Sequence, residues 1–240
     1  MNPIIVIPAR LNSSRLPQKA LVDIKGKTMI QRVWEQAIKS EVGEVLVACD
    51  DQNVASIIKN LGGNVIMTSP DHPSGSDRIF EAVNSFDPGH KYDFVINLQG
   101  DLPNINPIVI QEALKPFSTM DIDIATLANK FESMQEAADP NNVKVAIAFK
   151  NERIGKALYF SRSMIPFGAS ELYHHIGIYA YKRQALERFV SLKPSPLEIT
   201  EKLEQLRALE DDMNIGVSIT HHSPISIDTA EDLNRLLASM

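Results

Sequence analysis

The chain has 240 residues, of which 44% are hydrophobic and 22% are charged, a composition typical of a globular protein with a sizeable core. Its net charge of −6 argues against nucleic acid or an anionic membrane as a partner, because both require a broad basic surface. Cys49 is the only cysteine, which excludes disulfides within the chain and cysteine-ligated metal clusters.

Neither export nor membrane insertion is expected. Strand-like sequence follows Asn2 and Pro3 at once, without the charged, apolar and cleavage regions of a secretory signal. No apolar run approaches the roughly 18 residues that suggest a membrane span. We therefore expect a cytoplasmic protein in a reducing compartment.

The first half of the chain alternates short apolar runs with amphipathic segments. The β-branched run at residues 4–7 predicts a buried strand that ends at Pro8. Further strands are expected at 45–48, 65–67 and 94–98, and helices at 28–39, 54–61, 77–86 and about 107–117. Strands that alternate with helices favour a parallel sheet.

The alternation is less regular in the second half. Strands are expected at 122–128, 143–149, 157–160, 176–181 and 215–219, with a short helix near 132–138 and a mostly helical segment at 194–210. Thr229 and Asp232 predict a capping box at the start of a last helix. The predicted fold is α/β: an open, mainly parallel sheet flanked by helices, with a smaller appended region at about 150–212.

Three cations follow the first predicted strand. Arg10, Arg15 and Lys19 lie on one loop with no acidic residue between them. A polyanion, most simply a triphosphate, would compensate three like charges held together. The alternative is a solvated basic loop.

Two other loops also follow predicted strands. In an open parallel sheet the ligand lies beyond the carboxyl ends of the strands, so these loops should meet the cationic loop there. The loop at 68–78 contains small hydroxyl residues and Arg78, and the loop at 99–103 contains Gln99 and Asp101. Asp101 could hold Mg²⁺ against substrate phosphates, or it could cap a turn or helix. Glycine-rich phosphate-binding fingerprints are absent, so a nucleotide here would be recognised by side chains.

Eight segments resemble, in order, the sequence blocks of one enzyme family, the CMP-Kdo synthetases (3-deoxy-manno-octulosonate cytidylyltransferases). They read PARLNSSRLPQKAL, DIKGKTMIQRV, TSPDHPSGSDR, INLQGDLP, ALYFSRSMIPF, HIGIYAYK, PLEITEKLEQLRAL and IDTAEDL. The resemblance covers nearly the whole chain. It implies a single nucleotidyltransferase domain over residues 1–240 with a Rossmann-like sheet, in which residues 150–212 bind the sugar acid and form dimer contacts.

The resemblance also implies a reaction. CMP is transferred from CTP to the anomeric 2-hydroxyl of 3-deoxy-manno-octulosonate (Kdo), and pyrophosphate is released, with Mg²⁺ as cofactor. The enzyme would be a cytosolic homodimer that serves lipopolysaccharide synthesis. The alternatives are the same reaction on another sugar acid, such as 8-amino-Kdo or sialic acid, and a catalytically silent nucleotide-binding protein of this fold.

The matching blocks imply roles for individual residues. Arg10, Arg15 and Lys19 would contact the triphosphate, and Arg15 and Lys19 would also take part in catalysis. Asp101 and Asp228 would be catalytic metal ligands. The residues that frame the cytidine would be Pro8, Ala9, Ser74, Arg78 and Gln99. The residues on the sugar-acid side would be Arg162, His175, Tyr179, Glu204 and Gln205.

One departure and several alternatives bear on these roles. Leu102 stands where the family commonly has glutamate, and we expect it to pack. Asp228 could cap the last helix, and Arg162 could pair with an acid. Glu204 could lie on a solvated helix face or in a dimer contact, and His175 could be a hydrogen-bonded strand residue. Metal binding by His174 and His175 together is not expected, because neighbouring strand residues point to opposite faces.

Overall fold

The computed structural model describes residues 1–11 and 16–240, and of Ser239 only the backbone. These residues form two compact units. The first consists of Met1–Ile110 and Pro224–Met240, and the second of Gln111–Ser223. The segment expected as an appended region, 150–212, lies within the second unit.

The first unit contains a parallel sheet centred on β1 (Pro3–Ala9). Its other strands are β4 (Glu44–Cys49), β5 (Asn64–Met67) and β6 (Phe94–Asn97), in the order β5-β4-β1-β6. Every pairing is parallel, and Val6 lies opposite both Leu46 and Asn97. The four residues 4–7 are fully buried, as a strand covered on both faces requires. The strands and the parallel sheet predicted for this half are confirmed.

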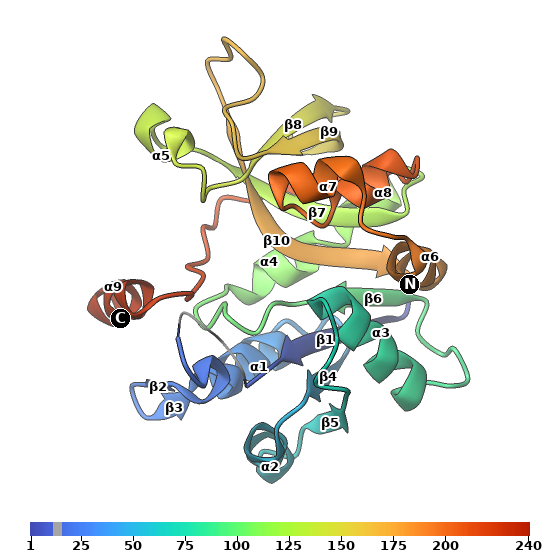
Figure 1. The fold of residues 1–240 in the computed structure, drawn as a ribbon, viewed down its shortest axis with the longest axis vertical. Coiled ribbons are helices and arrows are strands. Elements are labelled where there is room, and N and C mark those ends of the chain that lie inside the picture. The colour runs from blue at the N-terminus through green and yellow to red at the C-terminus, as the bar shows by residue number, and fades with distance from the viewer. Residues whose placement is uncertain (12–15) are drawn as a thin grey trace. The chain divides into compact units, whose positions relative to one another are not determined.

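Three helices connect these strands (Figure 1). They are α1 (Met29–Lys39), α2 (Gln52–Asn60) and α3 (Gly75–Phe86), and their N-caps are Thr28, Asp51 and Ser74. Helix α1 packs on β1, β4 and α2, whereas α3 packs on all four strands. Because parallel crossovers are right-handed, α1 and α2 cover one face of the sheet and α3 covers the other. The three predicted helices are confirmed.

The C-terminal segment completes the first unit. Helix α9 (Ala230–Ser239) begins with the predicted capping box between Thr229 and Asp232. Its Leu236 is buried in a cluster with Ile24, Met29 and Ile227. Ile24 lies in the small hairpin of β2 (Asp23–Ile24) and β3 (Lys27–Thr28), which leads directly into α1. This packing fixes the end of the chain against the segment that follows the cationic loop.

The second unit contains a mixed sheet in the order β10-β7-β11-β9-β8. Strands β7 and β11 are parallel, and the other pairings are antiparallel. The strands are β7 (Ile124–Lys130), β8 (Lys144–Phe149), β9 (Ile154–Ser161), β10 (Tyr173–Lys182) and β11 (Ile215–Ile219). All five were predicted from the sequence.

The helices differ more from expectation. Helix α5 (Met134–Ala138) was predicted, but α6 (Arg183–Ser191) was not. The segment 194–210 is not one helix: α7 (Pro196–Glu201) ends at Lys202, which has a left-handed φ of 55°, and α8 (Leu206–Glu210) follows. The helix expected at 107–117 is α4 (Pro107–Glu112) followed by the 3-10 turn η2 (Lys115–Ser118). Among the described residues, no helix combines the length and apolarity needed to cross a bilayer.

Candidate active site

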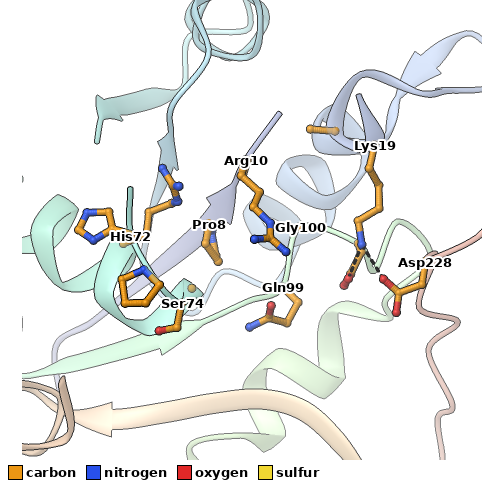
Figure 2. A pocket seen from close by; sticks show the side chains of 14 residues that line it. Pro8, Arg10, Lys19, His72, Ser74, Gln99, Gly100 and Asp228 are labelled. Carbon is orange, nitrogen blue, oxygen red and sulfur yellow. Dashed lines mark hydrogen bonds and ion pairs between the residues drawn. The ribbon is translucent and has the colours of Figure 1, made fainter. Parts of the chain in front are cut away.

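A pocket of about 390 Å³ opens in the first unit where the loops after β1, β5 and β6 meet. It is lined by nine of the residues that the sequence predicts for the nucleotide and metal: Pro8, Ala9, Arg10, Lys19, Ser74, Arg78, Gln99, Asp101 and Asp228. Figure 2 shows His72 and Ser74 at one end, Lys19 and Asp228 at the other, and Pro8, Arg10 and Gln99 between them. The pocket therefore has two chemically different ends.

Lys19 lies between two carboxylates at the end of the pocket that also contains Asp228. Its Nζ donates to Asp101 Oδ2 at 2.9 Å and to Asp228 Oδ1 at 3.0 Å (Figure 2). Burial by itself would lower the pKa of Lys19, but the two carboxylates outweigh it and the pKa is raised. Lys19 is therefore a cation at neutral pH.

The backbone brings the two carboxylates together although they are far apart in sequence. Asp101 follows β6, and its carbonyl oxygen accepts a hydrogen bond of 3.0 Å from the N–H of Ile227. Asp228 directly precedes Thr229, which is the N-cap of α9, so Asp228 is not the cap itself. Its own N–H donates to Asp232 Oδ2 at 3.1 Å. The N-cap of α9 is therefore Thr229 and not Asp228.

Arg78 holds the other end of the pocket together. Its side chain is buried and donates to Asp50 Oδ2 at 2.9 Å and to Thr68 Oγ1 at 2.6 Å. The same carboxylate of Asp50 accepts from the N–H of Leu11 at 3.0 Å. Arg78 therefore links the ends of β4 and β5 to the start of the cationic loop. This bridging role of Asp50 was not predicted from the sequence.

Ser74 and Gln99 present polar groups to the same pocket. The Ser74 hydroxyl caps α3, accepting from the N–H groups of Ser76 and Asp77 and donating to Asp77 Oδ2 at 2.7 Å. Gln99 Nε2 donates to Asn97 Oδ1 at 3.0 Å, which orients the side chain amide. Both contacts pre-position groups that can recognise a base by hydrogen bonds.

Five of the lining residues were not predicted as part of the site: Ala20, His72, Pro73, Gly75 and Gly100. His72 Nε2 is hydrogen-bonded to Glu81 Oε2, which also accepts from the N–H of Ser69. Gly100 is required by space, because a Cβ there would lie 2.8 Å from the carbonyl oxygen of Pro8. The sequence signal that could have identified His72 and Gly100 is their position inside two of the matching blocks, TSPDHPSGSDR and INLQGDLP.

Three further predictions concern Arg10, Leu102 and Arg15. Arg10 is exposed, and Leu102 is buried, so the expectation that Leu102 packs is confirmed. Arg15 lies outside the described residues. The described residues contain no group of three or more His, Cys, Asp or Glu side chains suited to a metal ion. The candidate metal ligands at the pocket are thus the pair Asp101 and Asp228.

Arg162, predicted to bind the sugar acid, lies in the second unit with its guanidinium engaged by backbone. It donates to the carbonyl oxygens of Glu201 at 2.8 Å, Pro140 at 3.0 Å and Lys202 at 3.4 Å. The carboxylate of Glu201 instead accepts from the Arg162 N–H and the Ser161 hydroxyl. Arg162 therefore stabilises the left-handed turn between α7 and α8.

His175 is buried and neutral. Its Nε2 lies 2.9 Å from Thr126 Oγ1, and the Thr126 hydroxyl donates to the carbonyl oxygen of Ile178 at 2.8 Å. Nε2 must therefore carry the proton and act as the donor to Thr126. Burial, with the neighbouring His174, lowers the pKa of His175 to about 3.

Tyr179 lies beside His175, and Glu204 in the turn before α8 lies near Tyr179. The Tyr179 ring centroid is 5.4 Å from that of His175, and burial, with Tyr181 and Glu204 nearby, raises the pKa of Tyr179 well above its ordinary value. Gln205 is buried at the N-cap of α8. Glu204 lies 3.8 Å from Arg207 Nη2. His175 and Tyr179 are thus neighbours, Glu204 lies near Tyr179, and Gln205 follows Glu204 directly in the chain.

Together the parallel sheet of the first unit and the cations and carboxylates beyond its strand ends define a nucleotide-binding α/β protein. Residues 4–215 match the Cytidylyltransferase family. The 3-deoxy-manno-octulosonate cytidylyltransferase of Bartonella henselae is 51% identical over 98% of this chain and 97% of its own length. The enzyme of the same name from Paramagnetospirillum magneticum is 46% identical over 99% of this chain and 97% of its own length.

A solved structure agrees with the sequence relatives. The structure of CMP:2-keto-3-deoxy-manno-octonic acid synthetase complexed with CTP matches with a TM-score of 0.92 and 40% identity, over 100% of this chain and 98% of that one. The chain therefore belongs to the 3-deoxy-manno-octulosonate cytidylyltransferase family. The resemblance and the α/β nucleotidyltransferase fold predicted from the sequence are confirmed.

Proposed function

We propose that this protein transfers CMP from CTP to the 2-hydroxyl group of 3-deoxy-manno-octulosonate and releases pyrophosphate. The observation that carries the proposal is the meeting of Lys19, Asp101 and Asp228 at one end of the pocket. The near full-length identity to cytidylyltransferases named for this sugar acid supports the choice of substrate. The product would serve lipopolysaccharide synthesis.

The two ends of the pocket suit the two parts of CTP. Arg10, Lys19 and Arg15 would bind the triphosphate and stabilise the charge on the departing pyrophosphate. The nucleoside would lie at the other end, framed by Pro8, Ala9, Ser74, Arg78 and Gln99. Holding the α-phosphorus in line with the sugar hydroxyl is the main contribution of such a site, and no covalent enzyme intermediate is needed.

Asp101 and Asp228 fit a magnesium ion. Both reach the same ammonium nitrogen, at 2.9 and 3.0 Å, so both can also reach one metal cation. Mg²⁺ usually keeps several waters and takes only one or two protein carboxylates. When bound, the ion would neutralise phosphate charge and make the attacking hydroxyl more acidic.

The sugar acid would contact the second unit. His175 and Tyr179 are both uncharged at neutral pH, as suits recognition of sugar hydroxyls, and Glu204 and Gln205 add acceptors. Arg162 is the candidate for the carboxylate, and it would have to exchange at least one backbone partner to bind it.

We also propose that the protein is a cytoplasmic homodimer. Several large apolar side chains of the second unit are exposed, among them Leu158, Phe167 and Ile199. Burial against a second copy would remove this apolar surface from water. Cys49 is the single cysteine and is buried, so the chain cannot form an internal disulfide, which suits a reducing compartment.

Pyrophosphate release from CTP tests the function. The purified protein is incubated with CTP and each of Kdo, 8-amino-Kdo and sialic acid, with Mg²⁺ or with EDTA. We expect turnover with Kdo and Mg²⁺, and none with EDTA. Turnover only with another sugar acid would refute the substrate, and no turnover with any of them would favour a silent nucleotide-binding protein.

A further inference from the structure

The Lys19 ammonium occupies the position that a metal between Asp101 and Asp228 would need. It lies within hydrogen-bond distance of both carboxylates, and the Lys19 side chain is only 18% exposed. Mg²⁺ binds carboxylate oxygens at about 2.0–2.1 Å, much closer than an ammonium nitrogen does. An ion bound by both carboxylates would therefore displace the ammonium.

The two carboxylates are carried by short side chains whose backbones are hydrogen-bonded, whereas the ammonium is carried by a long side chain. Asp101 and Ile227 share a backbone hydrogen bond, and Asp228 is held by its N–H bond to Asp232 at the start of α9. Lys19 reaches them through a flexible stem of four carbons. If one partner moves when the ion binds, it is the lysine side chain.

Lys19 also has a second anionic partner in the proposed function, the CTP triphosphate. We propose that Lys19 is an internal counter-ion that keeps the Asp101–Asp228 pair closed to divalent metal until a bound triphosphate draws the ammonium away. This inference rests on the proposed triphosphate and metal sites. Binding of the triphosphate and binding of the metal would then be coupled through the Lys19 side chain.

The coupling has a measurable consequence without any reaction. Removing the Lys19 charge should open the carboxylate pair, so metal should bind the nucleotide-free protein more tightly. Coupling energies between ligands usually correspond to factors of about 5 to 150 in affinity. Because linkage is reciprocal, metal should also help a triphosphate to compete for Lys19 in the wild-type protein.

The test measures the binding of Mn²⁺ to the nucleotide-free protein. The electron paramagnetic resonance signal of free Mn²⁺ reports how much of the ion remains unbound. Lys19→Met keeps the length of the side chain and removes its charge, and we expect it to bind Mn²⁺ at least about 5-fold more tightly than wild type. Lys27→Met is the matched control, because Lys27 is a lysine of the same unit that pairs with Glu35. It loses the same charge and should leave Mn²⁺ affinity unchanged.

Further variants make the result specific. Lys19→Arg retains the charge and should keep Mn²⁺ affinity low, and Lys19→Gln replaces Lys19→Met if the latter does not fold. Adding Asp101→Asn to Lys19→Met should abolish the gain. Equal Mn²⁺ affinities for wild type and Lys19→Met, or an equal gain in Lys27→Met, would overturn the inference.

The proposed function and this inference fail in different ways. If no sugar acid is turned over but Lys19→Met still binds Mn²⁺ more tightly, the counter-ion role stands and the substrate assignment does not. If wild type binds no Mn²⁺ even with a non-hydrolysable CTP analogue, the metal site is refuted and the inference with it.

Discussion

Asp101 and Asp228 carry the most direct prediction at the scale of single residues. Asp101→Asn and Asp228→Asn should each lower kcat by about 100-fold or more, since even the partners of metal ligands contribute 10- to 100-fold. Both side chains are partly exposed, so the unfolding temperature should change little. Pyrophosphate release and thermal unfolding measure the two effects.

The control for these variants is Asp121→Asn, which removes a fully exposed carboxylate paired with Lys182. It should retain the wild-type rate. Wild-type activity in either Asp101→Asn or Asp228→Asn would refute the metal assignment.

His175 predicts how stability depends on pH. Its pKa of about 3 in the folded protein lies below the ordinary value of 6.5, so the unfolded chain binds the proton more readily. The free energy of unfolding should therefore fall as the pH decreases from about 6.5 towards 3. Between pH 7 and pH 5, His175 should account for a loss of about 2 kcal/mol.

Urea unfolding at both pH values checks this dependence. His175→Gln keeps a hydrogen-bonding side chain but does not titrate, so its loss of stability between the two pH values should be smaller. His221→Gln, which replaces an exposed histidine, should behave as wild type does. An equal pH dependence in His175→Gln and wild type would show that His175 is not buried and neutral.

The capping box of α9 carries a prediction at the scale of an element. Thr229 accepts from the N–H of Asp232, and Asp232 in turn accepts from the N–H groups of Thr229 and Asp228. Thr229→Ala should lower the free energy of unfolding by about 1 kcal/mol. It should also weaken Mn²⁺ binding, because the backbone anchor of Asp228 depends on the same turn.

The matched control is Thr200→Ala, since Thr200 is an exposed helical threonine whose hydroxyl donates to the Pro196 carbonyl oxygen. It should leave Mn²⁺ binding unchanged. If Thr229→Ala loses stability but binds Mn²⁺ as wild type does, the capping box stabilises α9 without positioning Asp228 for metal binding.

The elements show where sequence patterns suffice and where they do not. Helix α1 was predictable because its apolar spacing, the cap Thr28 and the stop before Gly43 all agree. The break at Lys202 was not, since its left-handed turn depends on Arg162, 40 residues away, donating to the carbonyl oxygens of Glu201 and Lys202. A local pattern of apolar residues contains no information about such a partner.

The same distinction holds for the site. Lys19 and Asp101 could be placed together because both follow strands of one parallel sheet. The link from Arg78 to Asp50 and Thr68 could not, because charge pairing across elements depends on side chain positions that spacing does not determine. Asp228 was assigned through the family resemblance, since no pattern within the sequence connects it to the pocket.

The oligomeric state is a prediction for the whole molecule. Leu158 and Ile199 are 58% and 65% exposed, and both lie in the second unit. If they are buried in a homodimer, Leu158→Asp or Ile199→Asp should raise the dissociation constant of the dimer by about 10-fold or more. Sedimentation velocity over a range of concentrations measures it.

Ile38→Asp is the control, because Ile38 is an exposed isoleucine of the first unit. It should sediment as wild type does. A wild-type protein that sediments as a monomer at all concentrations would refute the homodimer.

The first unit is made from both ends of the chain, and this has a consequence for protein synthesis. Residues 1–110 supply the sheet and most of the pocket, but Asp228 and the helix that fixes it are translated only after the whole second unit. Domains generally fold as units while the chain leaves the ribosome, beginning at the N-terminus. A nascent or truncated chain without residues 224–240 would lack one carboxylate of the pocket and the side chains that cover Ile24 and Met29, so the pocket would be complete only after these residues have been synthesised.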